Sequence, residues 1–378
     1  MTVAPPAPPR VLILSAPYGS GHLRAAEALA RAFETEGAHP DVVDHFRRFV
    51  PPRFVRASLA VFWGVIRWAP RLWGLTYRLS ARIGPRSPAM GGMDRLGAAG
   101  LRAYLEATRP DVVVHVHPTP AAALAWLRGR GEATVPHGLV FTDFLAHPQW
   151  IYAGLDRYFV PTDGVRAGVV AHGVPADRVV TSGIPVHPGF SLPLDRATLR
   201  AALGLPPDIP AVLVTGGMRG VLGGIGEACE VLAGRPEPFA AVVLCGDDRR
   251  RARLQARFGA DRRFRILGRV EEMWRVMGAV DLVISKAGAL TCAEALALAR
   301  PLLCYRSLPG QEQANEEALV AAGAALRAGN RRELARHVGA LLGDPALRSA
   351  LSVAARAGRR PDAARVVAKE MLAVAGAG

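Results

Sequence analysis

Two side chains in the first half of the chain, His22 and Asp143, could each take a proton from a hydroxyl group. His22 closes a glycine-containing loop after the apolar run 11–14, and Asp143 follows the apolar run 138–142. An imidazole titrates near neutral pH, and a carboxylate can accept a proton or orient a histidine, so both are candidate general bases. Structural roles stay open for both, since His22 could close its loop with a hydrogen bond and Asp143 could cap a helix.

A phosphate-binding turn is predicted in the second half, where the apolar run 282–284 leads through a glycine-containing turn to a helix. The turn covers residues 286–289, and the helix is expected to begin at Leu290 or Thr291. Free backbone N–H groups and the positive end of the helix dipole would point at an anion there. Glu294 follows Thr291 by three residues, a spacing that fits either a capping box or a carboxylate aimed at ribose hydroxyl groups.

Polar side chains also crowd the segment that follows the next apolar run, 301–305. Gln311, Glu312 and Asn315 lie in a loop and at an expected helix start. Their donors and acceptors suit a ligand that is rich in hydroxyl groups. A solvated loop would explain any one of them, but together with Glu294 they predict a site that holds a sugar nucleotide.

Length and composition predict the architecture that must position these groups. A chain of 378 residues, of which 50% are apolar, is long enough for two domains with separate cores. Strand-like runs alternate with helix-like segments, which predicts an α/β fold with parallel sheets. The expected domains are residues 1–190 and 191–378, joined by the proline-containing segment 185–199.

Charge and cysteine content limit the partners and the compartment. The net charge of +15 favours anionic partners, and no nucleic-acid-binding motif accompanies it, so no nucleic acid is expected. The longest uncharged apolar run near the N-terminus, 57–66, has ten residues, whereas a bilayer span needs about twenty. The four cysteines form no Cys-x-x-Cys pair, and most of them are expected to be small buried residues in a reducing compartment: Cys229, Cys245, Cys292 and Cys304.

Residues 46–93 contain nine arginines, eight aromatic residues and no acidic residue. At about 100° per residue, two helices flanking Pro70 would each carry an arginine stripe beside aromatic and aliphatic side chains. Such helices lie in a membrane interface, where tryptophan favours the headgroup level and arginine attracts anionic lipid. Ordinary core helices with solvated arginines, or a nucleic-acid-binding face, are the alternatives. The residues expected at an anionic membrane surface are Trp63, Trp68, Trp73, Arg67 and Arg71.

Residues 270–294 and 308–312 resemble the donor half of inverting glycosyltransferases. The similarity is closest to the monogalactosyldiacylglycerol synthase and processive diacylglycerol glucosyltransferase type, which is family 28-like. It is more distant to the transferase that adds N-acetylglucosamine to lipid-linked muramyl peptide. Three further segments resemble the same family in the same order: Tyr18-Gly-Ser-Gly-His22, the Thr-Asp…His-Pro…Trp pattern of 141–150, and the Gly-Ile-Pro…Phe pattern of 183–190.

The resemblance implies a GT-B fold, with two Rossmann-like domains whose parallel sheets face each other across a cleft. The first domain would bind the acceptor and the membrane and the second the donor, with the last helix crossing back to the first. The expected reaction is inverting transfer of galactose or glucose from a UDP-sugar to diacylglycerol or a related lipid. No metal or other cofactor is expected, since no Asp-x-Asp motif is present. The resemblance also implies a peripheral protein at the cytoplasmic face of the membrane.

The resemblance assigns roles to individual positions. Gly21, His147 and Trp150 would border the acceptor, while Val270 and Met273 would border the uracil ring. Ala289 and Leu290 depart from the family, which often has Pro and Gly there, and the loop after Gly216 matches only loosely. The full set of implied donor-binding residues is Gly216, Gly217, Val270, Met273, Gly288, Ala289, Leu290, Thr291, Glu294, Gln311, Glu312 and Asn315.

Other functions fit parts of the same pattern. N-acetylglucosamine transfer to a polyprenyl-linked peptidoglycan precursor would use the same turn and Glu294. A sugar-nucleotide epimerase shares the two-domain fold but needs no membrane face, and a non-catalytic membrane-surface binder could keep the fold as a scaffold. A nicotinamide dehydrogenase is disfavoured, because Arg24 stands where the dinucleotide motif needs its last glycine.

Overall fold

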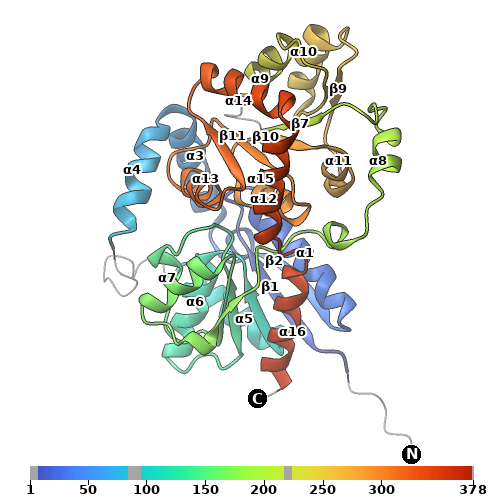
Figure 1. Ribbon diagram of the computed structural model, residues 1–378. Coiled ribbons are helices and arrows are strands. Elements are labelled where there is room, and N and C mark those ends of the chain that lie inside the picture. Colours follow the sequence, from blue (N-terminus) through green and yellow to red (C-terminus); the bar gives the residue numbers. More distant parts are fainter. Residues whose placement is uncertain (1–6, 84–94, 217–223, 377–378) are drawn as a thin grey trace, which may run out of the picture. The chain divides into compact units, whose positions relative to one another are not determined.

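The computed structural model describes residues 7–83, 95–216 and 224–376, which are drawn as coloured ribbon in Figure 1. The chain divides into two compact units. The first unit comprises residues 1–66, 76–188 and 362–378, and the second comprises residues 67–75 and 189–361. Each unit contains one parallel sheet with helices against it, so the predicted α/β fold class with parallel sheets is confirmed.

The first unit is built on a six-stranded parallel sheet in the order β2-β1-β3-β4-β5-β6. Its central strands are short runs of Val, Leu and Ile that are buried along their length, as expected where helices cover both faces of a parallel sheet. β4 starts and ends earlier than the predicted run 138–142. The strands are β1 (Arg10–Ser15), β2 (His39–Asp44), β3 (Val112–His115), β4 (His137–Val140), β5 (Arg157–Val160) and β6 (Val179–Thr181).

The helices of the first unit connect its strands and cover the sheet. The last helix, α16, packs on α1 in a shared apolar core with β1 and β3. Its Met371 packs closely on β4, since a Cβ on Gly138 would lie 2.6 Å from the Met371 sulfur and would require that side chain to shift. The elements are α1 (Gly21–Thr35), α2 (His45–Phe49), α5 (Ala98–Thr108), α6 (Pro118–Gly129), η2 (Pro148–Trp150), α7 (Asp163–Ala171), η3 (Ala176–Arg178) and α16 (Ala363–Gly376).

The second unit has a six-stranded parallel sheet in the order β12-β11-β10-β7-β8-β9. All four cysteines are buried and free, which agrees with the burial predicted for most of them. The strands are β7 (Ala211–Thr215), β8 (Ala240–Leu244), β9 (Phe264–Leu267), β10 (Leu282–Ser285), β11 (Leu302–Tyr305) and β12 (Ala325–Ala328). The helices are η4 (Pro188–Ser191), α8 (Arg196–Ala202), α9 (Ile225–Ala233), α10 (Asp248–Phe258), α11 (Met273–Ala279), α12 (Ala289–Ala297), α13 (Gln311–Ala321), α14 (Arg331–Gly343) and α15 (Pro345–Ala357).

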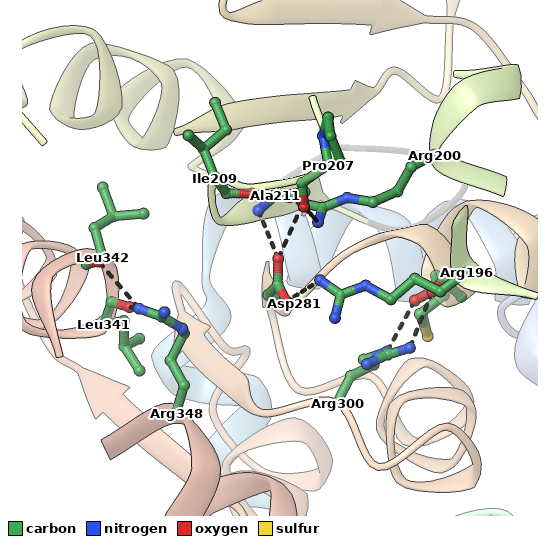
Figure 2. A network of polar contacts seen from close by, with 12 residues as sticks. Arg196, Arg200, Pro207, Ile209, Ala211, Asp281, Arg300, Leu341, Leu342 and Arg348 are labelled. Atoms are coloured by element: carbon green, nitrogen blue, oxygen red, sulfur yellow. Dashed lines mark hydrogen bonds and ion pairs between the residues drawn. The ribbon is translucent and has the colours of Figure 1, made fainter. Parts of the chain in front are cut away.

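A buried polar network around Asp281 fixes the start of two central strands in the second unit (Figure 2). One Asp281 oxygen accepts hydrogen bonds from the Ala211 backbone N–H at 2.8 Å and from Arg200 at 3.2 Å. The other oxygen pairs with Arg196. The buried Arg200 guanidinium also donates to the carbonyls of Pro207 and Ile209. The network therefore ties α8 and the segment after it to the first residues of β7 and β10.

Two helices between β2 and α5 carry the arginine-rich segment: α3 (Pro52–Trp68) and α4 (Pro70–Ser80). A helix break at Ala69 agrees with the prediction of two helices flanking Pro70. Residues 67–75 group with the second unit and the rest of both helices with the first. None of the described helices combines the length and the apolar character that a bilayer span requires.

Candidate active site

His22 lies at the position of the first sheet where open α/β folds bind ligands. β1 lies between β2 and β3, so the direction of the strand connections reverses between β1 and β3, and ligands bind outside the carboxyl ends of strands at such a switch point. The loop after β1 leads to α1, and His22 is the second residue of that helix. A Cβ on Gly21 would meet no atom within 4 Å, which leaves open space beside the histidine.

The His22 ring is held in one protonation state by its neighbours. Its Nδ1 lies 2.8 Å from the carbonyl oxygen of Val116, which follows β3. A carbonyl can only accept, so Nδ1 carries the hydrogen and Nε2 of the neutral ring keeps its lone pair. Burial lowers the pKa of His22 to about 4, against a smaller opposing effect of the Val116 carbonyl. His22 is therefore neutral at pH 7 and can accept a proton at Nε2.

Aromatic and hydroxyl groups surround this imidazole. The ring of His117 stands edge-on to it with 4.9 Å between ring centroids, and the hydroxyl of Thr142 lies 3.2 Å from its Nδ1. Trp150, predicted to shape the acceptor pocket, is buried and packs on Phe141 with its ring centroid 6.3 Å from that of His22. The structure thus gathers His22, His117, Thr142 and Trp150 from three separate connections, those after β1, β3 and β4, at one sheet edge.

Asp143 lies in the bend after β4, next to the end of α4. Burial raises the pKa of Tyr77 on α4, and the negative charge of Asp143 raises it further. The residue before it, Thr142, makes the contact to His22. Asp143 is thus the chain neighbour of the residue that contacts His22, and its own charge acts on Tyr77.

His147 links the 141–150 segment to α4 through hydrogen bonds. Its Nδ1 accepts the backbone N–H of Gln149 at 3.2 Å, so Nε2 carries the hydrogen of the neutral ring. Nε2 lies 3.3 Å from the Ser80 hydroxyl and 3.4 Å from the Tyr77 carbonyl. Both ring nitrogens are engaged and the side chain is buried, which gives His147 a positioning role beside any contact with an acceptor.

The predicted donor residues lie around the corresponding switch point of the second sheet. β7 lies between β10 and β8, so the carboxyl ends of β7 and β10 border the crevice where ligands bind. A small pocket opens there, lined by Thr215, Gly224, Ser285 and Lys286 among others. Ser285 Oγ is buried with no hydrogen-bond partner among the described residues. Gly216 directly follows β7, whereas Gly217 falls outside the described residues.

The turn after β10 leads into α12, but the predicted capping box is wrong. The helix begins at Ala289 with Gly288 as N-cap, so Thr291 is already inside the first turn and Glu294 is the sixth helical residue. Gly288 has no side chain to cap the helix, so the first N–H groups of α12 have no side-chain cap from the N-cap residue, as at the helix ends that bind anions. Glu294 is buried in the next turn.

The first turns of α13 are tied to that turn by two side chains, Glu312 and Asn315. Glu312 pairs with Lys286, and its other oxygen accepts the Leu308 backbone N–H at 2.9 Å. Asn315 is fully buried and donates to the Ala287 carbonyl at 3.2 Å. Gln311 begins α13 and is half-buried. The structure therefore brings the predicted Gln311, Glu312 and Asn315 beside the α12 N-terminus.

Val270 and Met273 occupy the neighbouring connection. Val270 lies in the segment after β9, and Met273 is the first residue of α11. Both are half-buried, so part of each remains available to a ligand. Among the described residues, no three His, Cys, Asp or Glu side chains come together as a metal site would require.

Known proteins share these features over nearly the whole chain. The monogalactosyldiacylglycerol (MGDG) synthase family matches residues 22–186, and the glycosyltransferase family 28 C-terminal domain matches residues 211–334. The processive diacylglycerol beta-glucosyltransferase of Bacillus cytotoxicus is 30% identical over 338 residues, which cover 89% of this chain and 86% of the relative. The protein of the same name from Bacillus mycoides is 29% identical over 367 residues, which cover 97% of this chain and 94% of the relative.

This chain belongs to the processive diacylglycerol beta-glucosyltransferase family. The prediction of a UDP-sugar-dependent glycosyltransferase is confirmed. The crystal structure of MurG from Acinetobacter baumannii superposes with a TM-score of 0.63 over 97% of this chain and 100% of that chain, at 16% identity. That likeness concerns the fold, and it confirms the GT-B prediction.

The sequence analysis missed several residues that position the site of this glycosyltransferase. Lys286 pairs with Glu312, although the sequence analysis gave this first residue of the predicted turn 286–289 no role of its own. Ser307 accepts the Ala287 backbone N–H at 3.1 Å and donates to the buried Glu316 at 2.6 Å. His117 and Thr142 contact His22 although they are far from it in the sequence. Spacing alone gave no sign of these contacts.

The glycosyltransferase exposes apolar side chains along α3 and α4. Of the ten exposed large apolar residues in the described structure, six lie on these two helices. On α3 they repeat every seven residues, with Val61 65% and Trp68 79% exposed, which places them on one stripe. We call these six residues the apolar stripe: Phe54, Val61, Trp68, Leu72, Leu75 and Leu79.

Arginines flank the apolar stripe, but two of the predicted tryptophans do not belong to it. Arg67 and Arg71 are exposed, and the Arg67 guanidinium lies 5.0 Å from the centroid of the Trp68 ring. Trp63 and Trp73 are half-buried, and both contact other residues. Aliphatic side chains, which the sequence analysis did not single out, therefore supply most of the outward apolar surface.

Proposed function

We propose that this glycosyltransferase transfers a hexose, glucose or galactose, from a UDP-sugar to diacylglycerol or a related lipid with inversion at the anomeric carbon. One observation carries the proposal. A neutral, oriented imidazole lies in the half that matches MGDG synthase, and an uncapped helix N-terminus lies in the half that matches family 28. The relatives' names support diacylglycerol as acceptor and glucose as the first hexose to test.

His22 is the proposed general base of the transfer. The acceptor hydroxyl oxygen forms a bond to the anomeric carbon, and the bond from that carbon to the UDP oxygen breaks. The hydroxyl proton passes to His22 Nε2, and the electron pair of the broken bond leaves with UDP. The sugar of UDP-glucose is α-linked, so a β-linked product, as in the names of the relatives, is what a single displacement yields. Asp143 is the alternative base, or it supports His22.

The second unit is proposed to offset the charge that develops on the diphosphate. The N–H groups at Ala289, Leu290 and Thr291 and the dipole of α12 would meet the phosphates. Glu294 would accept hydrogen bonds from the ribose, and Gln311 and Glu312 from the sugar. We propose that this fixed arrangement operates without a metal ion.

The apolar stripe is proposed to dock the enzyme on an anionic membrane. Burial of exposed leucine, valine, phenylalanine and tryptophan side chains in the interface would release water, and the flanking arginines would pair with lipid phosphates. The absence of acidic residues from 46 to 93 leaves that positive charge uncompensated within the segment. These features support a peripheral association with the membrane, and we propose the cytoplasmic face as its site.

A panel of donors and acceptors tests the proposal. The enzyme is incubated with UDP-glucose, UDP-galactose or UDP-N-acetylglucosamine and vesicles that contain diacylglycerol and phosphatidylglycerol. Mass spectrometry is expected to find hexosyl-diacylglycerol, and proton NMR is expected to find a β linkage. Vesicles without diacylglycerol and the His22→Ala variant are the controls. Product only from UDP-N-acetylglucosamine with a polyprenyl-linked precursor, or an α-linked product, would refute the proposal.

A further inference from the structure

A glycine in the middle of α4, Gly74, packs closely against the loop that precedes α13. Gly74 is buried, whereas its near neighbours in the sequence, Leu72 and Leu75, are exposed on the same helix. A Cβ at Gly74 would lie 2.5 Å from the Pro309 Cβ, 3.2 Å from its carbonyl carbon and 3.4 Å from the Gly310 nitrogen. Gly74 and Pro309 belong to the same compact unit.

Helix propensity does not account for a glycine at this position. Glycine in a helix interior is about 1 kcal/mol less favourable than alanine, so propensity alone would favour alanine at position 74. The close approach of Pro309 supplies a packing reason for the glycine. Gly64 on α3 offers the contrast, because a Cβ there would meet no atom within 4 Å.

The loop that Gly74 touches has an unusual backbone conformation and is bonded to neighbouring elements. Gly310, the N-cap of α13, has φ 96° and ψ −118°, a conformation that side-chain-bearing residues rarely adopt. Arg306 has φ 61° and is held there by two hydrogen bonds to Glu227. A displacement of Pro309 would therefore pass into Gly310 and the first residues of α13.

Those first residues are Gln311 and Glu312. Glu312 closes the loop by accepting the Leu308 N–H, and it also pairs with Lys286 next to the turn before α12. Both contacts depend on where the Pro309–Gly310 backbone lies. The inner face of α4 thus acts on the side chains that are proposed to hold the donor sugar.

We propose that Gly74 is a positioning residue for donor-sugar binding, which it supports by letting α4 pack directly on Pro309 and Gly310. The inference rests on the proposed function, since it takes Gln311 and Glu312 as the groups that hold the sugar. It assigns to α4 a second role, because the outer face of the same helix carries Leu72, Leu75 and Leu79 of the apolar stripe.

The test compares Gly74→Ala with Gly64→Ala, because both replace a helical glycine by the better helix former. Isothermal titration measures the affinity for UDP-glucose, UDP-galactose and UDP. Gly74→Ala is expected to bind the UDP-hexose about fivefold to tenfold more weakly, the effect of losing one well-placed hydrogen bond. Its affinity for UDP is expected to stay within about twofold, because Gln311 and Glu312 face the sugar, while Gly64→Ala binds all three as the wild type does.

Removing the opposing Cβ provides a rescue. Pro309→Gly alone and Gly74→Ala combined with Pro309→Gly complete a double-mutant cycle. Addition of Gly74→Ala to the Pro309→Gly background is expected to change UDP-hexose affinity by less than about twofold. KM for the UDP-hexose should rise in Gly74→Ala with kcat little changed, and thermal unfolding should show no loss of stability.

Three outcomes would overturn the inference. In the first, Gly74→Ala binds the UDP-hexose as tightly as Gly64→Ala does. In the second, UDP and UDP-hexose lose affinity equally, which points to general damage to the donor half, and the proposed function stands in both of these cases. In the third, the wild-type chain binds no UDP-hexose, so the proposed function fails and the inference falls with it.

Discussion

His22 and Val116 are joined by a hydrogen bond of 2.8 Å from the ring Nδ1 to the backbone carbonyl oxygen. The two residues are brought together by β1 and β3, which pair in parallel at the switch point of the first sheet. The hydrogen bond determines that Nδ1 of His22 carries the hydrogen. Val116 directly follows β3, so this strand positions the carbonyl that orients the His22 ring. A base oriented in this way is ready to act without a change of tautomer.

Replacement of His22 by alanine should lower kcat by about 10²- to 10⁴-fold, which is the usual contribution of a positioned general base. The affinity for UDP should not change, because the donor residues lie on other elements. Steady-state kinetics and titration with UDP measure the two quantities. Asp143→Asn should have a smaller effect, and His172→Ala, at an exposed position, serves as control. Near-normal turnover of His22→Ala would remove it as the base.

Replacement of Glu294 by glutamine should weaken UDP binding by about tenfold to a hundredfold, since a hydrogen bond to a charged group contributes about 1.5–3 kcal/mol. The buried carboxylate is proposed to accept hydrogen bonds from ribose hydroxyls, and an amide accepts them less strongly. Titration with UDP measures the change. Glu317→Gln, at an exposed position of α13, should bind UDP normally. If both variants bind alike, Glu294 does not contact the ribose.

The first unit should lose stability in acid. Burial lowers the pKa of His45 to about 4 and of His137 to about 3, and lowers that of His115 well below its usual value. These pKa values lie below the unfolded value of about 6.5, so the unfolded chain binds more protons as pH falls below it. Each such histidine costs about 1.4 kcal/mol of unfolding free energy per pH unit in that range.

Urea unfolding at a series of pH values from 8 to 5 measures this loss. The free energy of unfolding should be nearly constant above pH 7 and fall steeply below 6.5. In the wild type, His45 Nε2 lies 2.8 Å from the Leu96 carbonyl oxygen, and the amide of His45→Gln could still donate to it. The free energy of unfolding of His45→Gln should fall less steeply with pH than that of the wild type. A slope that is the same in both proteins would show that His45 does not contribute.

The apolar stripe should control binding to vesicles. Leu72→Ser removes a side chain whose burial is worth about 1.5–3 kcal/mol, so partitioning onto phosphatidylglycerol vesicles should drop about tenfold or more. Val353→Ser provides a matched control, because Val353 is exposed on α15 and lies outside the stripe. Co-sedimentation measures both. Equal binding of the two variants would assign the membrane contact to another surface.

The Asp281 network should be essential to the stability of the second unit. Asp281→Ala leaves the guanidinium of Arg200 and the N–H of Ala211 without their common acceptor (Figure 2). Loss of one partner of a buried ion pair costs about 3–5 kcal/mol, which chemical denaturation can measure. Asp177→Ala, at an exposed position, should change the free energy of unfolding by less than about 0.5 kcal/mol. A similar small change in both variants would contradict the account of the network.

The sequence by itself determined the fold class, the enzyme family and the main elements of both sheets. Apolar runs such as 11–14 and 282–284 are long enough to be strands and too continuous for an exposed surface, so their role could be read locally. Polar clusters such as Gln311, Glu312 and Asn315 follow strands directly, and chain order alone brings them to the carboxyl edge. Helix boundaries were harder to predict from the sequence, and the N-cap of α12 is Gly288 instead of Thr291.

Only the tertiary structure decided which side chains meet and which face outward. His22 acquires its tautomer from Val116, a residue 94 positions away, and its lowered pKa from burial in the folded unit. Periodicity could place arginines on a helix face, yet it could not tell that Trp68 is exposed while Trp63 and Trp73 are half-buried. Contacts such as Gly74 with Pro309 depend on the packing of distant segments. Burial, desolvation and steric fit arise from that packing, and no local pattern in the chain encodes them.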